Sequence, residues 1–207
     1  MFYFPNLNVV YCPIERTASR STEAYLFAHD SAGYRLGPHR HSCSLEELNG
    51  LNPSKIYVST RHPWDRVCSM FAADKLKENA GFNIHWTTID EYLDFLFTNK
   101  DVPFLLEGNS VMPNLTSWMG KLIDNTIVHF YRSQHSYLSV LSGQNITLLP
   151  YDQVGLITSE SWANSNISFD HIGETDNEAN SLYSVERESK LKLVFENDYG
   201  NYADWSV

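Results

Sequence analysis

Two stretches of sequence decide the predicted fold, NVVYCPIERTASRST at residues 8–22 and KIYVSTRHPWDRVCS at residues 55–69. Each begins with a run of β-branched and aromatic residues that is typical of a buried strand, and then passes through a polar loop. Helical segments are expected to follow at residues 22–28 and 64–78. Strands that alternate with helices in this way predict βαβ units and a parallel sheet.

Further segments extend the same pattern toward the C-terminus. Additional strands are predicted at residues 127–131 and 146–150, and additional helices at residues 45–48, 89–97, 114–122 and 136–141. An amphipathic helix is expected over residues 180–199, with Leu182, Val185, Leu191, Val194 and Phe195 as its inward positions. We therefore predict an α/β fold, a single domain over residues 1–207 with a central parallel sheet flanked by helices.

The composition is that of a globular chain. Of its 207 residues 43% are hydrophobic and 14% aromatic, while 19% are charged, which argues against global disorder. No apolar run approaches the roughly 20 residues that a membrane-spanning helix needs, and the N-terminus does not resemble a signal peptide. The three cysteines have no CxxC spacing, so a reducing compartment is expected.

The charge is unevenly distributed along the chain. The formal net charge is −10, but residues 1–77 hold nine basic and seven acidic residues, whereas residues 78–207 hold six and eighteen. This asymmetry places any anion-binding chemistry in the first third of the chain. Broad nucleic-acid binding is disfavoured, because it usually requires a basic face.

The first candidate anion site is the loop at residues 15–22. A loop between a strand and a helix directs backbone N–H groups and the positive helix end at a ligand, while Arg16 and Arg20 add charge. A phosphate or a sulfate is the natural occupant. The segment lacks the GxxxxGK[S/T] pattern of a Walker A loop and contains no glycine. The alternative is a solvated helix N-terminus with two surface arginines.

The second candidate site begins where the strand at residues 55–60 ends. Arg61 follows the strand, Pro63 suits the first turn of a helix, and Arg66 and Ser69 share a helix face. Two guanidinium groups and a hydroxyl group beside a strand end form a phosphate clamp. The alternative is a surface pair between Asp65 and Arg66.

Together these segments resemble the sulfotransferases that use 3′-phosphoadenosine 5′-phosphosulfate (PAPS). That family has an R-x-P-x-x-R-x-x-S motif, which Arg61, Pro63, Arg66 and Ser69 match at every defined position. It also has a K/R-T-x-S/G-T-S/T loop after the first strand, which residues 16–21 match except that Arg20 stands where threonine is usual. Weaker likenesses lie at residues 134–138, 148–154, 171–174 and 194–202.

The resemblance implies a P-loop-NTPase-like sulfotransferase fold and assigns the binding residues. Those expected to hold the 5′-phosphosulfate are Arg16, Thr17, Ala18, Ser19, Arg20, Ser21 and Thr22. Arg61 and Ser69 are expected to fix the 3′-phosphate, with Arg66 in support. Arg16 keeps its charge at any working pH, which gives it a purely electrostatic role in catalysis.

A general base for the acceptor hydroxyl is expected in the loop between the two motifs. His39 and His41 form an H-x-H pair like the one that supplies the base in heparan and uronyl 2-O-sulfotransferases, the subgroup closest in motifs. The alternatives are a surface loop whose histidines have no role, or a glutamate base at Glu23, Glu46 or Glu47. A metal site from His39, His41, His62 and His85 is not expected, because the spacing identifies no third ligand.

The predicted reaction moves a sulfuryl group from PAPS to a hydroxyl group, leaving 3′-phosphoadenosine 5′-phosphate (PAP). The acceptor is expected to be a carbohydrate or another small hydroxyl compound, and a neutral acceptor is as plausible as a polyanionic glycan. The resemblance and the lack of an anchor predict a soluble cytoplasmic enzyme of microbial or viral origin. The alternatives are a nucleotide or small-molecule kinase and a nucleotide-binding module without catalysis.

Overall fold

The structure is a computed structural model that describes residues 1–37, 40, 45–79, 86–98, 133–163, 166–167, 169 and 179–205. Contacts between Cα atoms divide the chain into two compact units. The first comprises Met1–His62, Gln134–Glu174 and Asn201–Val207, and the second comprises Pro63–Ser133 and Thr175–Gly200. The elements predicted at residues 114–122 and 127–131, and the likeness at residues 171–174, lie outside the described residues.

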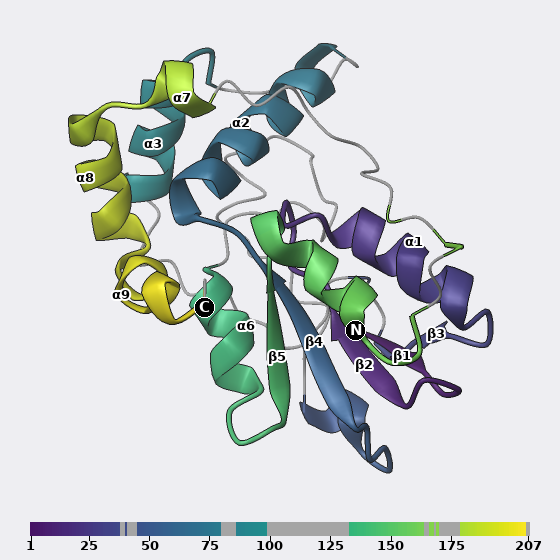
Figure 1. Cartoon of the computed structure of the whole chain (residues 1–207). Helices are drawn as coiled ribbons and strands as arrows, with labels where there is room; N and C mark the ends of the chain where they lie inside the picture. Colours follow the sequence, from purple (N-terminus) through teal and green to yellow (C-terminus); the bar gives the residue numbers. More distant parts are fainter. Residues whose placement is uncertain are drawn as a thin grey trace. The chain divides into compact units, whose positions relative to one another are not determined.

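The first unit is built on a five-stranded mixed sheet with the strand order β3-β1-β2-β4-β5 (Figure 1). Three strands predicted from the sequence are present and parallel, namely β2 (Val9–Cys12), β4 (Lys55–Thr60) and β5 (Ile146–Pro150). Two further strands, β1 (Phe2–Phe4) and β3 (Tyr34–Arg35), pair antiparallel at one edge.

The predicted parallel sheet is therefore present in β2, β4 and β5, but the sheet as a whole is mixed because of that edge. The chain turns between β1 and β2 within residues 5–8, where Asn8 has a φ of 53° and its N–H donates to the Pro5 carbonyl at 3.3 Å. A connection this short joins only antiparallel neighbours, because a parallel pair needs a crossover of a dozen or more residues.

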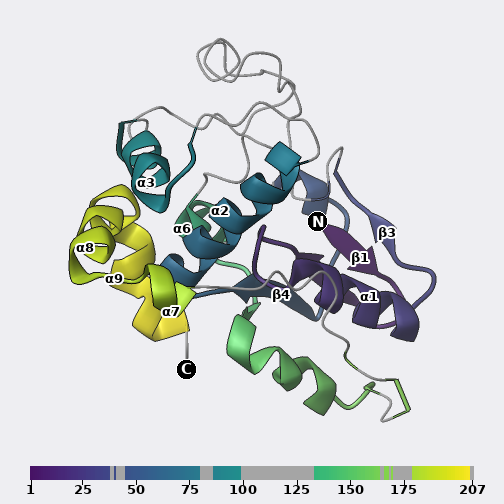
Figure 2. The same cartoon turned by 90° about the horizontal axis from the view of Figure 1, so that it is seen from above.

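Helices cover both faces of this sheet. Val10 and Val58 face a core that includes Leu48 of η1 (Leu45–Leu48) and Tyr137 of α6 (Gln134–Val140). Their strand neighbours, among them Tyr11 and Tyr57, face a second core with α1 (Ser19–His29) and η2 (Tyr151–Ser159). Figure 2 shows α6 and the green η2 on opposite sides of β4. The alternation of strand side chains thus yields three layers, with the sheet in the middle.

The second unit is helical and has its own core. Its elements are α2 (Pro63–Asn79), α3 (Ile89–Thr98), α7 (Ala179–Leu182), α8 (Val185–Val194) and the start of α9 (Glu196–Trp205). Its buried core is rich in aromatic side chains, including Trp64, Trp86, Tyr92 and Phe95. Among the described residues, no helix has both the length and the apolar character needed to cross a membrane.

The continuous helix predicted over residues 180–199 is broken in two places. Ser184 caps a new helix, because its hydroxyl accepts a hydrogen bond from the Arg187 N–H at 3.2 Å, and Phe195 with a φ of −119° ends that helix. Leu191 and Phe195 are buried as predicted, whereas Val185 is 72% exposed, contrary to the prediction. The new start at Ser184 places Val185 in a first turn that faces solvent.

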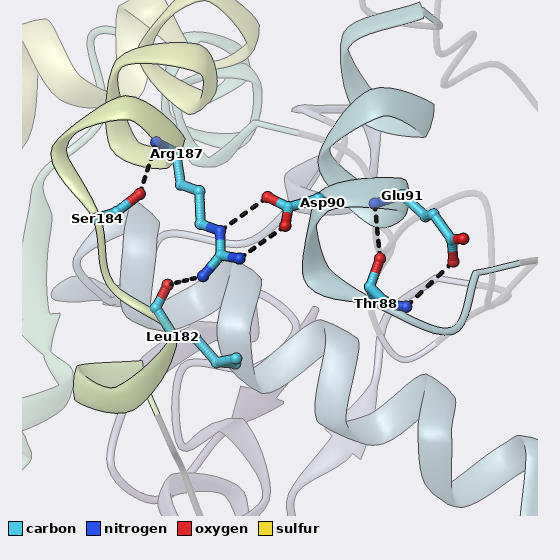
Figure 3. Close-up of polar contacts among 6 residues, drawn as sticks. All are labelled: Thr88, Asp90, Glu91, Leu182, Ser184 and Arg187. Carbon is cyan, nitrogen blue, oxygen red and sulfur yellow. Dashed lines mark hydrogen bonds and ion pairs between the residues drawn. The ribbon is translucent and has the colours of Figure 1, made fainter.

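Polar contacts join α3 to α8 (Figure 3). Arg187 donates to both carboxylate oxygens of Asp90, at 2.7 and 2.6 Å, and to the Leu182 carbonyl at 2.8 Å. At the start of α3, Thr88 accepts from the Glu91 N–H at 3.2 Å, while the Glu91 carboxylate accepts from the Thr88 N–H at 3.1 Å. This reciprocal pair is a capping box, which fixes where α3 begins.

Candidate anion site

The candidate site lies at the carboxyl ends of β2 and β4. Because these strands are parallel, with Cys12 opposite Val58, the segments that follow them leave the same edge of the sheet. Residues 13–18 lead from β2 into α1, and Arg61 follows β4 directly. Ligands of open α/β sheets bind at such carboxyl edges.

The loop after β2 has an unusual backbone. Arg16 and Ala18 have φ angles of 63° and 58°, in the left-handed region that side-chain-bearing residues seldom adopt. Ala18 is the N-cap of α1, and it offers no side-chain hydrogen bond to the helix, whose first turn holds no acidic residue. The positive end of α1 is thus left without a capping side chain, and strained backbone of this kind concentrates at ligand sites.

Hydrogen bonds among buried hydroxyl groups connect this loop to the sheet. Thr17 Oγ1 lies 2.7 Å from both the Ile14 carbonyl oxygen and Ser59 Oγ, and Ser59 Oγ lies 2.9 Å from the Tyr11 hydroxyl. Burial is the main cause that raises the pKa of Tyr11 far above its ordinary value, so its phenol stays protonated. These contacts fasten the loop to β2 and β4.

Arg61 is held against the loop and against η2. Its Nη1 donates to the Arg16 carbonyl oxygen at 3.4 Å, and its Cζ lies 4.1 Å from the centroid of the Tyr151 ring. The backbone N–H of Arg61 donates to Gln134 Oε1 at 2.8 Å, and Gln134 Nε2 donates to the Arg61 carbonyl at 2.7 Å. Arg61 is only 8% exposed, so its positive charge lies at this edge in a largely desolvated environment.

The other predicted binding residues of the loop differ in exposure. Arg20 is exposed and Arg16 and Ala18 are half-buried, whereas the hydroxyl residues Thr17, Ser19, Ser21 and Thr22 are buried. Thr22 turns its hydroxyl to the Ala18 carbonyl at 3.3 Å. In the loop, then, Arg20 is the most exposed side chain, and the hydroxyl groups of Thr17 and Thr22 turn to main-chain carbonyls.

Arg66 and Ser69 are buried on α2, in the second unit. Pro63 begins that helix, as predicted from the motif. The motif that starts at Arg61 thus continues from the first unit into the second, which begins at Pro63.

The predicted bases, His39 and His41, lie outside the described residues. Arg40 between them is described, and its Nε lies 2.7 Å from Glu23 Oε2 on α1. Of the alternative glutamate bases, Glu23 is therefore ion-paired, Glu46 is exposed and Glu47 is half-buried on η1. In the part of the chain that the structure describes, no group of three His, Cys, Asp or Glu side chains is placed to hold a metal ion.

Four residues at or next to this edge were not among the predicted site residues, namely Gln134, Tyr151, Glu15 and Tyr137. Gln134 and Tyr151 contact Arg61, and the buried carboxylate of Glu15 accepts a hydrogen bond from the Tyr137 hydroxyl at 2.8 Å. Gln134, Tyr137 and Tyr151 stand in the sequence stretches that weakly resemble the sulfotransferases. That likeness was the one available signal, but it did not say what they contact.

The assembled edge suits a compact anion. It places the buried Arg61 guanidinium against the main chain of Arg16, with a helix N-terminus and backbone in a left-handed conformation, all of which favour negative charge. Glu15 adds one buried carboxylate to the same loop. The surrounding burial strengthens such electrostatic contacts. Comparisons of the chain with models of protein families, with curated protein sequences and with solved structures gave no match.

Proposed function

We propose that this chain is a PAPS-dependent sulfotransferase with a P-loop-NTPase-like fold, which transfers a sulfuryl group to an acceptor hydroxyl. The observation that carries the proposal is the hydrogen bond from Arg61 Nη1 to the Arg16 carbonyl at 3.4 Å. It brings together the starts of two motifs that are 45 residues apart and that, in the family they resemble, bind opposite ends of one nucleotide.

In the proposed reaction, the acceptor oxygen attacks sulfur in line with the bond to the 5′-phosphate. The S–O bond to that phosphate breaks, its electron pair stays on PAP, and the acceptor proton passes to a base. Catalysis of this kind is mainly positioning and charge stabilisation, by analogy with phosphoryl transfer. His41 or His39 is the proposed base, on the strength of the resemblance.

The predicted binding residues have distinct roles in this scheme. Arg16, the amides of residues 17–22 and the N-terminus of α1 would stabilise charge on the departing 5′-phosphate. Arg61 would bind the 3′-phosphate, and the motif adds Ser69 with Arg66 in support. The proposal rests on the first unit, because Arg66 and Ser69 belong to the second.

Calorimetric titration with PAP tests the proposal. We expect the wild-type chain to bind PAP, and Arg61→Ala to weaken binding by about 1–3 kcal/mol, the scale for losing a charged hydrogen bond. Arg35→Ala is the matched control, because Arg35 is an exposed arginine on β3, away from the β2–β4 edge. No PAP binding by the wild type, or equal binding by Arg61→Ala, would contradict the proposal.

Two further measurements separate the alternatives. A thermal shift with Mg-ATP in place of PAP would favour a kinase. PAP binding without sulfate transfer to any of a panel of hydroxyl acceptors would favour an inactive nucleotide-binding module.

A separate experiment concerns the base. Loss of turnover with intact PAP binding in His41→Ala or His39→Ala would identify the base.

A further inference from the structure

Gln134 makes an unusual contact with the main chain at Arg61. It is the first residue of α6, is completely buried, and lies 73 positions from Arg61 in the sequence. Its side-chain amide accepts from the Arg61 N–H at 2.8 Å and donates to the Arg61 carbonyl at 2.7 Å. The same two-bond exchange joins paired residues of neighbouring strands. Gln134 therefore extends the pairing of β4 by one residue, through a side chain.

The chemistry of this contact is specific to an amide. A carboxamide carries both a donor and an acceptor, whereas a carboxylate only accepts and an aliphatic side chain does neither. Replacing Gln134 would remove one or both of these hydrogen bonds from the buried main chain of Arg61, which is costly. The main chain at Arg61 would then relax away from its present direction.

The direction of the main chain matters because the Arg61 guanidinium makes specific contacts at its present position. It lies over the Tyr151 ring at 4.1 Å and donates to the Arg16 carbonyl at 3.4 Å. A rotation of the backbone displaces the end of a long side chain. A displacement of about 1 Å in a group that positions a substrate can lower the reaction rate about a hundredfold. The orientation of the guanidinium thus depends on Gln134.

We propose that Gln134 is a positioning residue for anion binding: it fixes the main chain of Arg61 so that the guanidinium is oriented before the nucleotide arrives. This inference rests on the proposed function, because it assumes that Arg61 binds a phosphate of PAP. Gln134 is completely buried, so we expect its effect on affinity to pass through Arg61.

A double-mutant cycle on PAP affinity tests this dependence. We expect Gln134→Leu to weaken PAP binding about tenfold in the wild-type background. In the Arg61→Ala background, the same change should have less than about a twofold effect, because the group that it positions is gone. Ser139→Ala, at an exposed position on the same helix, is the control and should leave PAP affinity unchanged.

Gln134→Glu provides a second measurement, which does not depend on placing an apolar leucine at this buried polar position. Its carboxylate can accept from the Arg61 N–H but cannot donate to the carbonyl, whereas the protonated carboxyl can do both. The PAP affinity of this variant, expressed relative to the wild type at each pH, should therefore recover between pH 8 and pH 5.5. Because a buried carboxylate also repels an anion, the uncharged Gln134→Leu variant shows the effect of losing the hydrogen bonds without an added charge.

The outcomes distinguish this inference from the proposed function. If the wild type binds PAP and Arg61→Ala weakens it, but Gln134→Leu weakens binding equally in both backgrounds or not at all, the inference is wrong and the proposed function stands. A relative affinity of Gln134→Glu that does not change with pH also overturns it. If the wild type does not bind PAP, both fail together.

Discussion

At the scale of single residues, the hydroxyl groups beneath the anion site form a chain with one direction. The Ile14 carbonyl can only accept a hydrogen bond, so the Thr17 hydroxyl donates its one proton to that carbonyl. The Ser59 hydroxyl then donates to Thr17 and accepts from the Tyr11 phenol, which also reaches the Ser19 carbonyl at the longer distance of 3.5 Å. The Thr17 hydroxyl is thus committed inward, and what Thr17 can offer a bound anion is its backbone N–H.

This direction predicts unequal effects of two substitutions. Ser59→Ala removes the middle of the chain and with it two hydrogen bonds, while Thr17 keeps the Ile14 carbonyl and Tyr11 keeps the Ser19 carbonyl as partners. At about 0.5–1.5 kcal/mol for each bond, we expect a loss of about 1–3 kcal/mol in the free energy of unfolding. Tyr11→Phe removes only the first donor and should cost about 0.5–1.5 kcal/mol. Urea denaturation measures both, and an equal or larger effect of Tyr11→Phe would contradict the central position of Ser59 in this chain.

At the scale of elements, the sequence predicted best what is decided locally. The strand at residues 55–60 and the helices at residues 64–78 and 89–97 are present within one residue at each end, because burial and apolar spacing are visible in the sequence. The strands β1 and β3 were not predicted, because three and two residues are too few to show a period. Ser184 did carry a start signal, a serine two positions before Glu186, but the apolar pattern appeared continuous across it.

The contact between α3 and α8 makes a prediction about pH. Hydrogen bonds from Arg187 hold the pKa of Asp90 below its ordinary value. A depressed pKa in the folded state means that the pair stabilises the fold above about pH 4 and that this contribution is lost as the pH falls and Asp90 takes up a proton. The effect is small, under about 1 kcal/mol, because the pair is solvent-exposed.

Asp90→Asn isolates this contribution. The variant should be less stable than the wild type at pH 7, and the difference in their free energies of unfolding should shrink as the pH approaches 3. Urea denaturation across this range gives both values, and the other carboxylates affect both proteins alike. A difference that stays constant down to pH 3 would show that the ion pair does not stabilise the contact between α3 and α8.

At the scale of the whole molecule, the site combines what the sequence could and could not reveal. The two loops could be predicted, because each follows a recognisable strand and parallel strands end at one edge. Gln134 and Tyr151 could not, because their approach to Arg61 depends on how α6 and β5 pack on the sheet. Gln134 and Tyr151 lie 73 and 90 residues from Arg61 in the sequence, so no local pattern shows that they are its neighbours.

The distribution of charge over the molecule bears on the acceptor. The arginines of the candidate site lie in the first third of the chain, which has a small positive balance, whereas the chain as a whole has a formal net charge of −10. A compact anion such as PAP would feel mainly the nearby arginines, because the Debye length is about 8 Å at physiological salt. An extended polyanion would also meet the acidic remainder of the surface.

We therefore predict that the chain binds PAP immobilised on a resin but passes through heparin at the same ionic strength, about 0.15 M. The two resins are both anionic, so the comparison separates recognition of one nucleotide from general attraction to negative charge. A neutral or weakly charged hydroxyl compound would then be the class of acceptor to screen first. Retention on heparin would instead indicate a basic face that outweighs the net charge, and it would move the search to sulfated or carboxylated glycans.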